Sequence, residues 1–310
     1  MSDRLATRLA LLAKIESTYG TDSIPTGSAN AIMTKGLRVE PLQGATESRD
    51  LDRASLGNEA TYHVAPFDRL TFQVEFAGSS AVGTAPDWGV LLRACGFDET
   101  IDAGVSVTYA PISTGFESVT LYYYRDRQLR VLLGARGSVK FMLSPGGIPH
   151  FEFMFLGLRA TPTEIAMPTV DWSRFIQPLP VTAGNSPTFT LDSYSANMVA
   201  LDLDMAVEVV HSNVVSAESI KIVDRAPTGT IRIEEPLISA KNYHTIIENH
   251  GEIPLQFIHG STAGNILTID APKVQLLSPV EGENQKVATL EATLNIIPDA
   301  GDDELVLTVT

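Results

Sequence analysis

Alternating apolar and polar residues recur along this chain and predict a fold built mainly from β-strands. The pattern is regular at 70–76, where Thr71, Gln73 and Glu75 separate apolar side chains. It returns at 119–133, 151–155, 201–209, 253–267 and 289–297. Alternation at this period places one face of each strand against a core and the other toward water, so these segments predict half-buried strands.

Two stretches of the chain carry the same order of elements. Residues 119–145 and 253–279 both alternate, turn, resume an apolar run and close on Leu-Ser-Pro, at a constant offset of 134 residues. A helix is predicted before each stretch, at 84–95 and at 239–250, and an Ala-Pro pair precedes each helix. Matches in the same order indicate an internal duplication of a unit made of strands and one flanking α-helix.

The predicted organisation follows from this repeat. Prolines are frequent at 166–187 and predict a stiff linker between the two copies. We therefore expect an N-terminal helix and extended arm at 1–58, a first domain at 59–165, the linker at 166–187 and a second domain at 188–310.

The first 58 residues are predicted to differ from both repeats. Ser2 is a helix cap, and the predicted helix runs to about Tyr19 with an apolar stripe formed by Leu5, Leu9, Leu12 and Ile15. This helix packs on its own domain or on a neighbouring subunit, and the pattern does not separate the two. Weak periodicity and many Gly, Pro, Ser and Thr residues at 21–58 predict an arm ordered by a partner rather than a mobile loop.

Composition and charge narrow the classes of function. Apolar residues make up 44% of the 310, which is enough for a real core, and 37 acidic against 22 basic residues give a net charge of -15. Tight nucleic-acid binding relies on clustered Lys and Arg, so this charge argues against it, although an acidic surface suits a passage that DNA crosses without sticking. The single cysteine fits a reducing cytoplasm, and no apolar run predicts a signal peptide or membrane insertion.

Motifs for catalysis, cofactors and metals are absent from the sequence, which predicts that the protein is not an enzyme. The six histidines form no ligand cluster, since His244 and His250 lie on opposite faces of the second predicted helix. Cys95 falls on the apolar face of the first predicted helix and is expected to be a buried hydrophobe. We expect no catalytic, cofactor-binding or metal residue. The acidic stretch 299–304 is expected to be a solvated turn rather than a calcium loop.

The strand predicted at 201–209 carries an unusual set of charges. Asp202, Asp204 and Glu208 lie on one face with no cation on the same strand, so their carboxylates must be solvated. Exposed carboxylates keep ordinary pKa values, whereas acid–base catalysis needs a perturbed one. The set is either a hydrated strand surface or a surface with a specific electrostatic role.

A set of framework stretches runs through nearly the whole chain: Glu40–Leu42 to Gly57–Asn58 with Ser48–Arg53, Glu75–Gly78, Gly83–Phe97, Leu133–Gly137, Asp224–Gly229 and Asp270–Val274. In these stretches the chain resembles the tail tube proteins of long-tailed bacteriophages, in particular those of transposable phages infecting Gram-negative bacteria. The resemblance consists of framework positions, so it carries no active site.

This resemblance implies a β-sandwich domain, flanked by a helix, whose hairpins join those of neighbours into a closed barrel lining a tube. Tubes of this family are usually six-fold rings, so a chain with two copies of the domain implies rings of three chains. The implied lumen is acidic and lets DNA pass, with Asp202, Asp204 and Glu208 as lumen-facing candidates.

The expected partners are other copies of the chain and the tape measure, tail terminator and distal tail proteins, together with DNA in transient passage. The expected location is the virion tail, assembled in the host bacterial cytoplasm. The alternative is a soluble β-sandwich component of the tail that binds a receptor or carbohydrate. That function needs an exposed aromatic platform, for which Tyr122 and Tyr124 are the candidates, although burial in a sheet is the plainer use for them.

Overall fold

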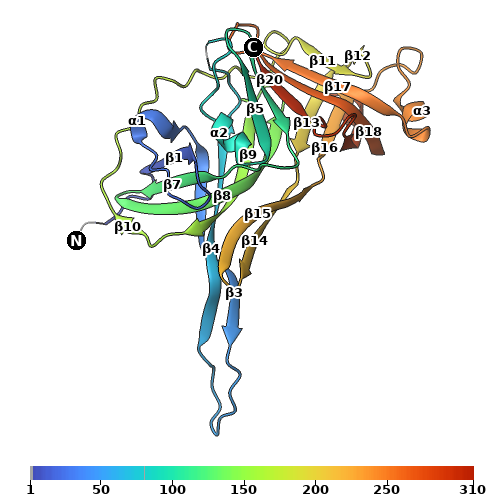
Figure 1. Cartoon of the computed structure of the whole chain (residues 1–310). Coiled ribbons are helices and arrows are strands. Elements are labelled where there is room, and N and C mark those ends of the chain that lie inside the picture. Colours follow the sequence, from blue (N-terminus) through green and yellow to red (C-terminus); the bar gives the residue numbers. More distant parts are fainter. Residues whose placement is uncertain (1–2, 80) are drawn as a thin grey trace.

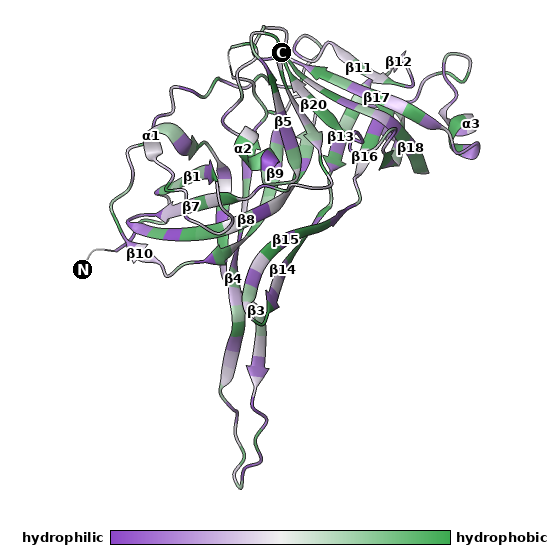
Figure 2. Ribbon diagram, viewed as in Figure 1, coloured by the Kyte–Doolittle hydropathy of each residue, from purple (hydrophilic) through white to green (hydrophobic). Residues whose placement is uncertain are grey.

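A computed structural model describes residues 3–79 and 81–310 and confirms the expected mainly β fold (Figure 1). Eighteen strands form one antiparallel sheet, and two further strands form a separate hairpin. Hydrophobic and hydrophilic residues alternate along many of these strands (Figure 2). A long hairpin, formed by the third and fourth strands, projects from the rest of the molecule. Among the described residues, no helix has the length and apolar character to cross a membrane.

The N-terminal half holds ten strands and two short helices. Its elements are β1 (Leu9–Ile15), α1 (Gly27–Asn30), β2 (Ala31–Ile32), β3 (Lys35–Ser48), β4 (Thr61–Glu75), α2 (Gly89–Arg93), β5 (Phe97–Asp102), β6 (Ser106–Pro111), β7 (Val119–Arg125), β8 (Gln128–Leu143), β9 (His150–Arg159) and β10 (Thr163–Glu164).

The C-terminal half holds ten more strands and one helix. Its elements are β11 (Thr188–Leu191), β12 (Tyr194–Ser195), β13 (Met198–Asp204), β14 (Val207–Val214), β15 (Ala217–Arg225), β16 (Thr228–Glu234), α3 (Tyr243–Glu248), β17 (Glu252–His259), β18 (Leu267–Asn284), β19 (Val287–Ile297) and β20 (Val306–Val309).

The two halves pair their strands in the same order. In the N-terminal half the neighbours run β1, β7, β8, β9, β4 and β3. In the C-terminal half they run β11, β17, β18, β19, β16 and β13. A short helix, α2 or α3, lies in the corresponding place along the chain, before β7 or β17. This correspondence extends the repeat seen in the sequence to the pairing of strands.

Two strand pairings connect the halves into one sheet. Strand β13 pairs with the end of β8 through the partners Leu201↔Leu143 to Asp204↔Lys140. Strand β20 pairs with β18 on one side and with β6 on the other. The segment 166–187, the predicted linker, contains no helix or strand and returns the chain from β10 to β11. The backbone of Val181 in this segment bonds Gly146 and Gly147 at 2.8 and 2.9 Å, which ties the segment to the N-terminal half.

The core of the N-terminal half is rich in aromatic rings. The Phe151 ring is fully buried and lies 4.9 Å from both Phe76 and Trp88 and 5.3 Å from Phe141, between ring centroids. Edge-to-face and tilted contacts between aromatic rings at these distances stabilise the fold beyond the hydrophobic burial of the ring surfaces. The packing therefore ties β4, α2, β8 and β9 together, as the alternation in the sequence predicts.

The β7–β8 hairpin closes through a two-residue turn at Asp126 and Arg127, both with positive φ angles of 36° and 67°. Two-residue hairpins favour this twisted backbone even though it is costly for residues other than glycine. The Asp126 carboxylate compensates, because it accepts hydrogen bonds from the Leu5 backbone N–H at 2.6 Å and from Arg8 Nη1 at 2.8 Å.

The predicted N-terminal helix is wrong, because residues 9–15 form strand β1 between β7 and β2. Ala10, Leu11, Leu12 and Ala13 are all buried, so the run is apolar on both faces and carries no period that separates strand from helix. The predicted cap, Ser2, lies outside the described residues.

The predicted irregular arm is also different in the structure. Residues 35–48 form strand β3, which pairs with β4 over its whole length, and the loop between them forms the tip of the projecting hairpin (Figure 1). Register shifts near Gln43 and at Leu42, whose φ is 58°, disturb the alternation along β3 and hide the strand from a pattern search.

Both predicted helices are shorter in the structure. Helix α2 begins at Gly89 rather than at the predicted cap Thr84, and Asp87 precedes the helix and pairs with Arg174 at 2.5 Å. Helix α3 begins at Tyr243, and its cap is Asn242, whose side chain accepts from the Thr245 N–H at 3.1 Å. His250, at the end of the predicted helix, lies outside α3 and is exposed.

Truncating the central ring tests this account of the core. We expect Phe151→Ala to lower the free energy of unfolding by about 3–5 kcal/mol, measured by urea unfolding, because it removes a buried ring and leaves a cavity. Val215→Ala is the control, since Val215 is 97% exposed and its change is expected to stay within about 0.5 kcal/mol. A loss below about 1 kcal/mol for Phe151→Ala contradicts the packing described.

Candidate functional site

A polar face extends across the joined sheet and passes from one half of the chain to the other. We define it by one row of cross-strand neighbours: Lys35, Gln73, Glu152, Lys140, Asp204, Thr228, Asn295 and Gln275. The row uses β3, β4, β9, β8, β13, β16, β19 and β18 in that order.

The face opposite this row is the hydrophobic core. Next to Lys140 along β8 stand Val139 and Phe141, and next to Asp204 on β13 stands Leu203, all three buried. Successive side chains of a strand point to opposite faces, so the same alternation that builds the core creates the polar face. The sequence patterns of 70–76, 151–155 and 201–204 thus predict which residues share this face.

Asp204 forms an ion pair across the joint between the halves. Its Oδ2 lies 2.7 Å from Nζ of Lys140 on β8, and this hydrogen bond raises the pKa of Lys140. The acidic strand therefore does have a cation beside it, supplied by the neighbouring strand. Sequence reasoning missed it because the pairing of β13 with β8 is not visible along either segment alone.

Asp202 lies on the same face without a cation in contact. Burial raises the pKa of its carboxyl group, the charge of Glu152 raises it further, and His150 and Lys140 lower it. One of its oxygens, Oδ1, is buried and has no hydrogen-bond partner within the described chain. The ionised carboxylate is therefore less stable here than in water.

Glu208 does not share this face, contrary to the expectation of one strand from 201 to 209. The chain turns at Ala206, where φ is 44°, and Glu208 lies on β14 in the separate two-stranded hairpin with β15. Sequence alternation continues through the break, since Met205 and Val207 are both buried, and for this reason the pattern did not reveal it.

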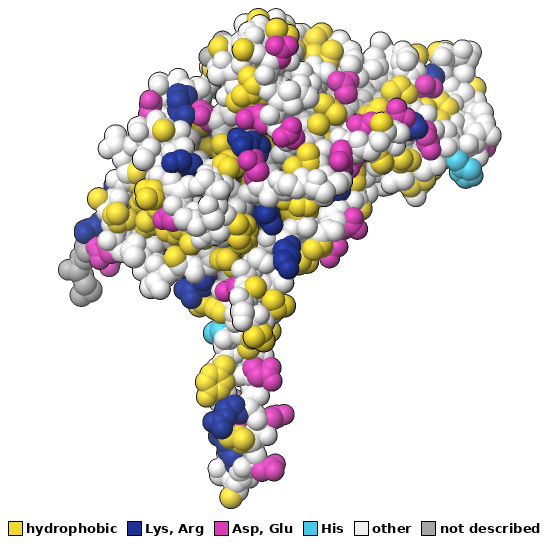
Figure 3. All heavy atoms as spheres, viewed as in Figure 1, with side chains coloured by type: hydrophobic (Ala, Val, Ile, Leu, Met, Phe, Trp, Pro, Cys, Tyr) yellow, Lys and Arg dark blue, Asp and Glu magenta, His cyan; other side chains and the backbone are white. Residues whose placement is uncertain are grey.

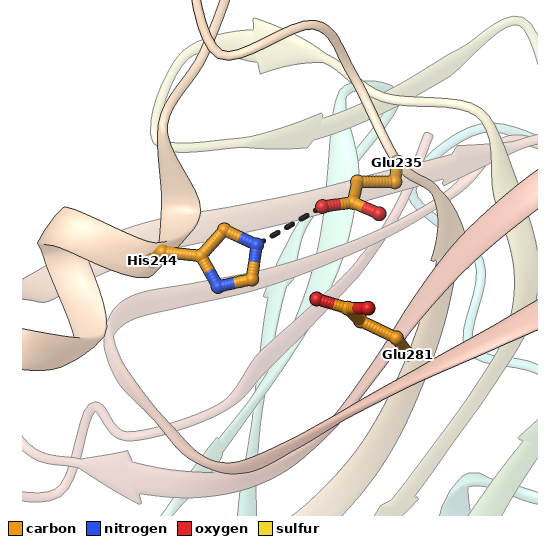
Figure 4. Close-up of side chains that lie close together, drawn as sticks. All are labelled: Glu235, His244 and Glu281. Atoms are coloured by element: carbon orange, nitrogen blue, oxygen red, sulfur yellow. Dashed lines mark hydrogen bonds and ion pairs between the residues drawn. The ribbon is translucent and has the colours of Figure 1, made fainter.

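One cluster of potential metal ligands emerges that the sequence did not suggest. Glu235, His244 and Glu281 come from three separate segments, and their ligand atoms lie within 4.8 Å of one another (Figure 4). Nε2 of His244 is 3.0 Å from Oε1 of Glu235, so an internal hydrogen bond already uses one of the ligands. A structural zinc centre needs four ligands, and the arrangement is explained as a hydrogen-bonded pair beside a further carboxylate.

The remaining candidates are buried in the fold. The thiol of Cys95 is buried, and burial raises its pKa well above the usual range, so it is a poor nucleophile. Tyr122 and Tyr124 are only 9% and 6% exposed, and the Tyr122 hydroxyl donates to Asp22 at 2.6 Å. These two tyrosines pack in the core and do not form an exposed platform.

Replacing Asp202 tests the electrostatics of the polar face. The pKa of the Asp202 carboxyl group is higher in the folded chain than the ordinary value of 3.8, so the folded state favours the protonated carboxyl group. This contribution to stability is present below pH 3.8 and is lost as the pH rises through the pKa of the folded chain. We therefore expect Asp202→Asn to increase the free energy of unfolding near neutral pH by about 0.5 kcal/mol or less and to raise the melting temperature slightly. In acid, where Asp202 is protonated, we expect this gain in stability to vanish.

Thermal unfolding of the two chains across a pH series measures this difference. Asp98→Asn, at an exposed position of β5, is the control for loss of one negative charge. A destabilised Asp202→Asn variant at neutral pH contradicts the burial described.

Comparison with known proteins identifies one family. A family model described as phage tail tube protein matches residues 6–310, nearly the whole chain. Comparison with curated proteins gives no match.

Proposed function

Since this chain belongs to the phage tail tube protein family, we propose that three copies form a ring and that stacked rings make the tube through which DNA passes. Family membership makes the protein a structural component of the phage tail and implies assembly with itself and with other tail proteins. The number of chains in a ring, the symmetry and the charge of the lumen are our inference from this chain.

The observation that carries the proposal is the repeated strand order with one joint already made inside the chain. The pairing of β13 with β8 joins a C-terminal sheet to an N-terminal sheet. A joint between unlike surfaces closes into a ring when the rotation between units permits. Three chains then contribute six similar halves, which gives pseudo-six-fold symmetry.

We further propose that the polar face lines the lumen. Asp202 and Asp204 lie on it, and Lys140 neutralises Asp204. Glu152 and Lys35 carry opposite charges within the row, so the net negative charge that we propose for this face rests on Asp202. Repulsion between this charge and phosphate keeps DNA from binding as it slides. Glu208 is proposed to contribute from the hairpin rather than from the sheet.

The other proposed partners follow from the place of a tube in a tail. We propose the tape measure, tail terminator and distal tail proteins as its further partners in the tail. Assembly in the host bacterial cytoplasm is consistent with a single buried cysteine that forms no disulfide. A receptor- or carbohydrate-binding role is not proposed, because Tyr122 and Tyr124 are buried.

The mass of the purified assembly tests the number of chains in a ring. One chain has a mass of 33.4 kDa, so native mass spectrometry is expected to show a ring of about 100 kDa, and electron microscopy is expected to show rings or tubes. A ring of six chains refutes the pseudo-six-fold proposal, and a persistent monomer that binds glycans favours the receptor-binding alternative.

A further inference from the structure

Two of the open sheet edges in the described chain lie on β3 and β18. Strand β3 pairs with β4 only, so its other edge at 35–40 is open. On β18, the edge that faces β17 is paired only as far as Gln275, so residues 276–284 are open on that side. Unpaired backbone N–H and C=O groups along an edge are a template for another strand.

The corresponding edges are already paired inside the chain. Strand β13 occupies the place in the C-terminal half that β3 occupies in the N-terminal half, and β8 corresponds in the same way to β18. Within the chain β13 pairs with β8. We infer that β3 of one chain pairs with the β18 edge of a second copy, as β13 pairs with β8. This inference rests on the proposed ring and names the surfaces that close it.

The internal joint also indicates the register. The β7–β8 ladder ends at Ala135, and β13 begins its pairing five residues later at Lys140. The β17–β18 ladder ends at Gln275, so the equivalent position is Val280. On β13, Asp204 is the last residue paired with β16 before the strand ends. On β3, the corresponding residue is Glu40, the last one paired with β4 before the register shift.

Glu40 therefore lies opposite Val280 of the second copy, and Arg38 lies opposite Gly282. This register places the polar side chains of β3 and β18 on the same face of the joined sheet. Arg38 and Glu40 share the polar side of β3 and β4 with Thr71 and Arg69, and Val280 shares the polar side of β18 and β19 with Glu291. A slip of one residue would turn one set toward the core.

Charge across this joint is complementary. On the β3 side, Arg38 and Arg69 flank Glu40 at 3.0 and 3.6 Å, which leaves one net positive charge. On the β18 side the acidic residue that shares the face of Val280 is Glu291, whereas Glu281 and Glu283 point to the other face. The internal joint uses the same principle through the pair of Lys140 and Asp204.

The hairpin that extends from each joint supports the same pairing. Within the chain, β14–β15 extends from the β13 joint and is held by Ile220, which is fully buried: its N–H donates to the Tyr19 hydroxyl at 2.6 Å, and its C=O accepts from Arg136 Nη1 at 3.0 Å. At the base of the projecting β3–β4 hairpin, Phe67 contacts His211 of β14 with ring centroids 4.8 Å apart, whereas further out Tyr62 and Val64 are 54% and 43% exposed. Figure 3 shows hydrophobic and charged side chains together along its length. A second copy covers them in the ring.

Disulfide trapping in the assembled protein tests the register. Opposed positions in an antiparallel ladder have Cβ atoms about 4.5–5.5 Å apart, close to the separation that a disulfide needs. The pairs Glu40→Cys with Val280→Cys, and Arg38→Cys with Gly282→Cys, are expected to cross-link chains under mild oxidation. The cross-linked products should end at three chains, because the third bond closes the ring.

Three controls accompany the two cysteine pairs. Arg38→Cys with Glu281→Cys, which places the thiols on opposite faces, is expected not to cross-link, and neither are the single variants. The native Cys95 is buried and adds no background. Cross-linking of the mismatched pair, products longer than three chains, or cross-linking in stacked tubes but not in isolated rings each overturns the inference.

Hydrogen exchange on the unmodified chain provides a test that needs no variant to fold. Backbone amides at 35–40 and 276–284 are expected to exchange more slowly in the ring than in dissociated chains, because only the ring pairs both edges. Amides of the β13 joint, which is made within the chain, serve as the reference. Trimeric rings in which neither edge gains protection refute this pairing and leave the proposed ring itself standing.

Discussion

The structure depends on one requirement: backbone hydrogen-bonding groups at the edge of a sheet need partners. Most edges in this chain are satisfied internally. Strand β1 is held between β2 and β7, β13 between β16 and β8, and β20 between β18 and β6. The pairing of β13 with β8 and of β20 with β6 makes one sheet out of two similar halves. A chain whose halves differ mainly in which edges are already paired has the geometry of a unit in a larger closed structure.

Much of this organisation could be predicted from alternation alone. The strands around Phe72, Phe153 and Leu203 follow the two-residue period because one face is buried and the other is polar, so the pattern predicted both the strands and the faces. Prediction failed where that condition is absent. Strand β1 is buried on both faces, and β3 is interrupted by register shifts, so neither has a clean period. The break at Ala206 was missed because the burial pattern continues across it.

The candidate site illustrates a second limit of sequence reasoning. Asp202 and Asp204 were identified correctly as neighbours on one strand face, but the residue that most affects Asp204 is Lys140, which is distant in sequence. Electrostatics on a sheet depends on cross-strand neighbours, and register is a tertiary property. The same is true of the Glu235, His244 and Glu281 cluster, whose members come from separate segments. Composition correctly indicates an acidic protein, whereas only strand pairing decides where that charge is neutralised.

The contrast between the two hairpins connects folding with assembly. An isolated two-stranded hairpin is marginally stable in water and needs a third strand or a packed face. The β14–β15 hairpin has such a face, since Ile220 is enclosed by its own chain, whereas the outer part of β3–β4 has exposed apolar side chains and no cover. Contacts with the rest of the chain therefore contribute little to the conformation of this outer part. If a second copy provides the missing surface, ordering of this hairpin and closure of the ring are one coupled step, and the free energy of the joint includes the cost of ordering the hairpin. The internal joint carries no such cost, because its two strands are already held by the rest of the fold.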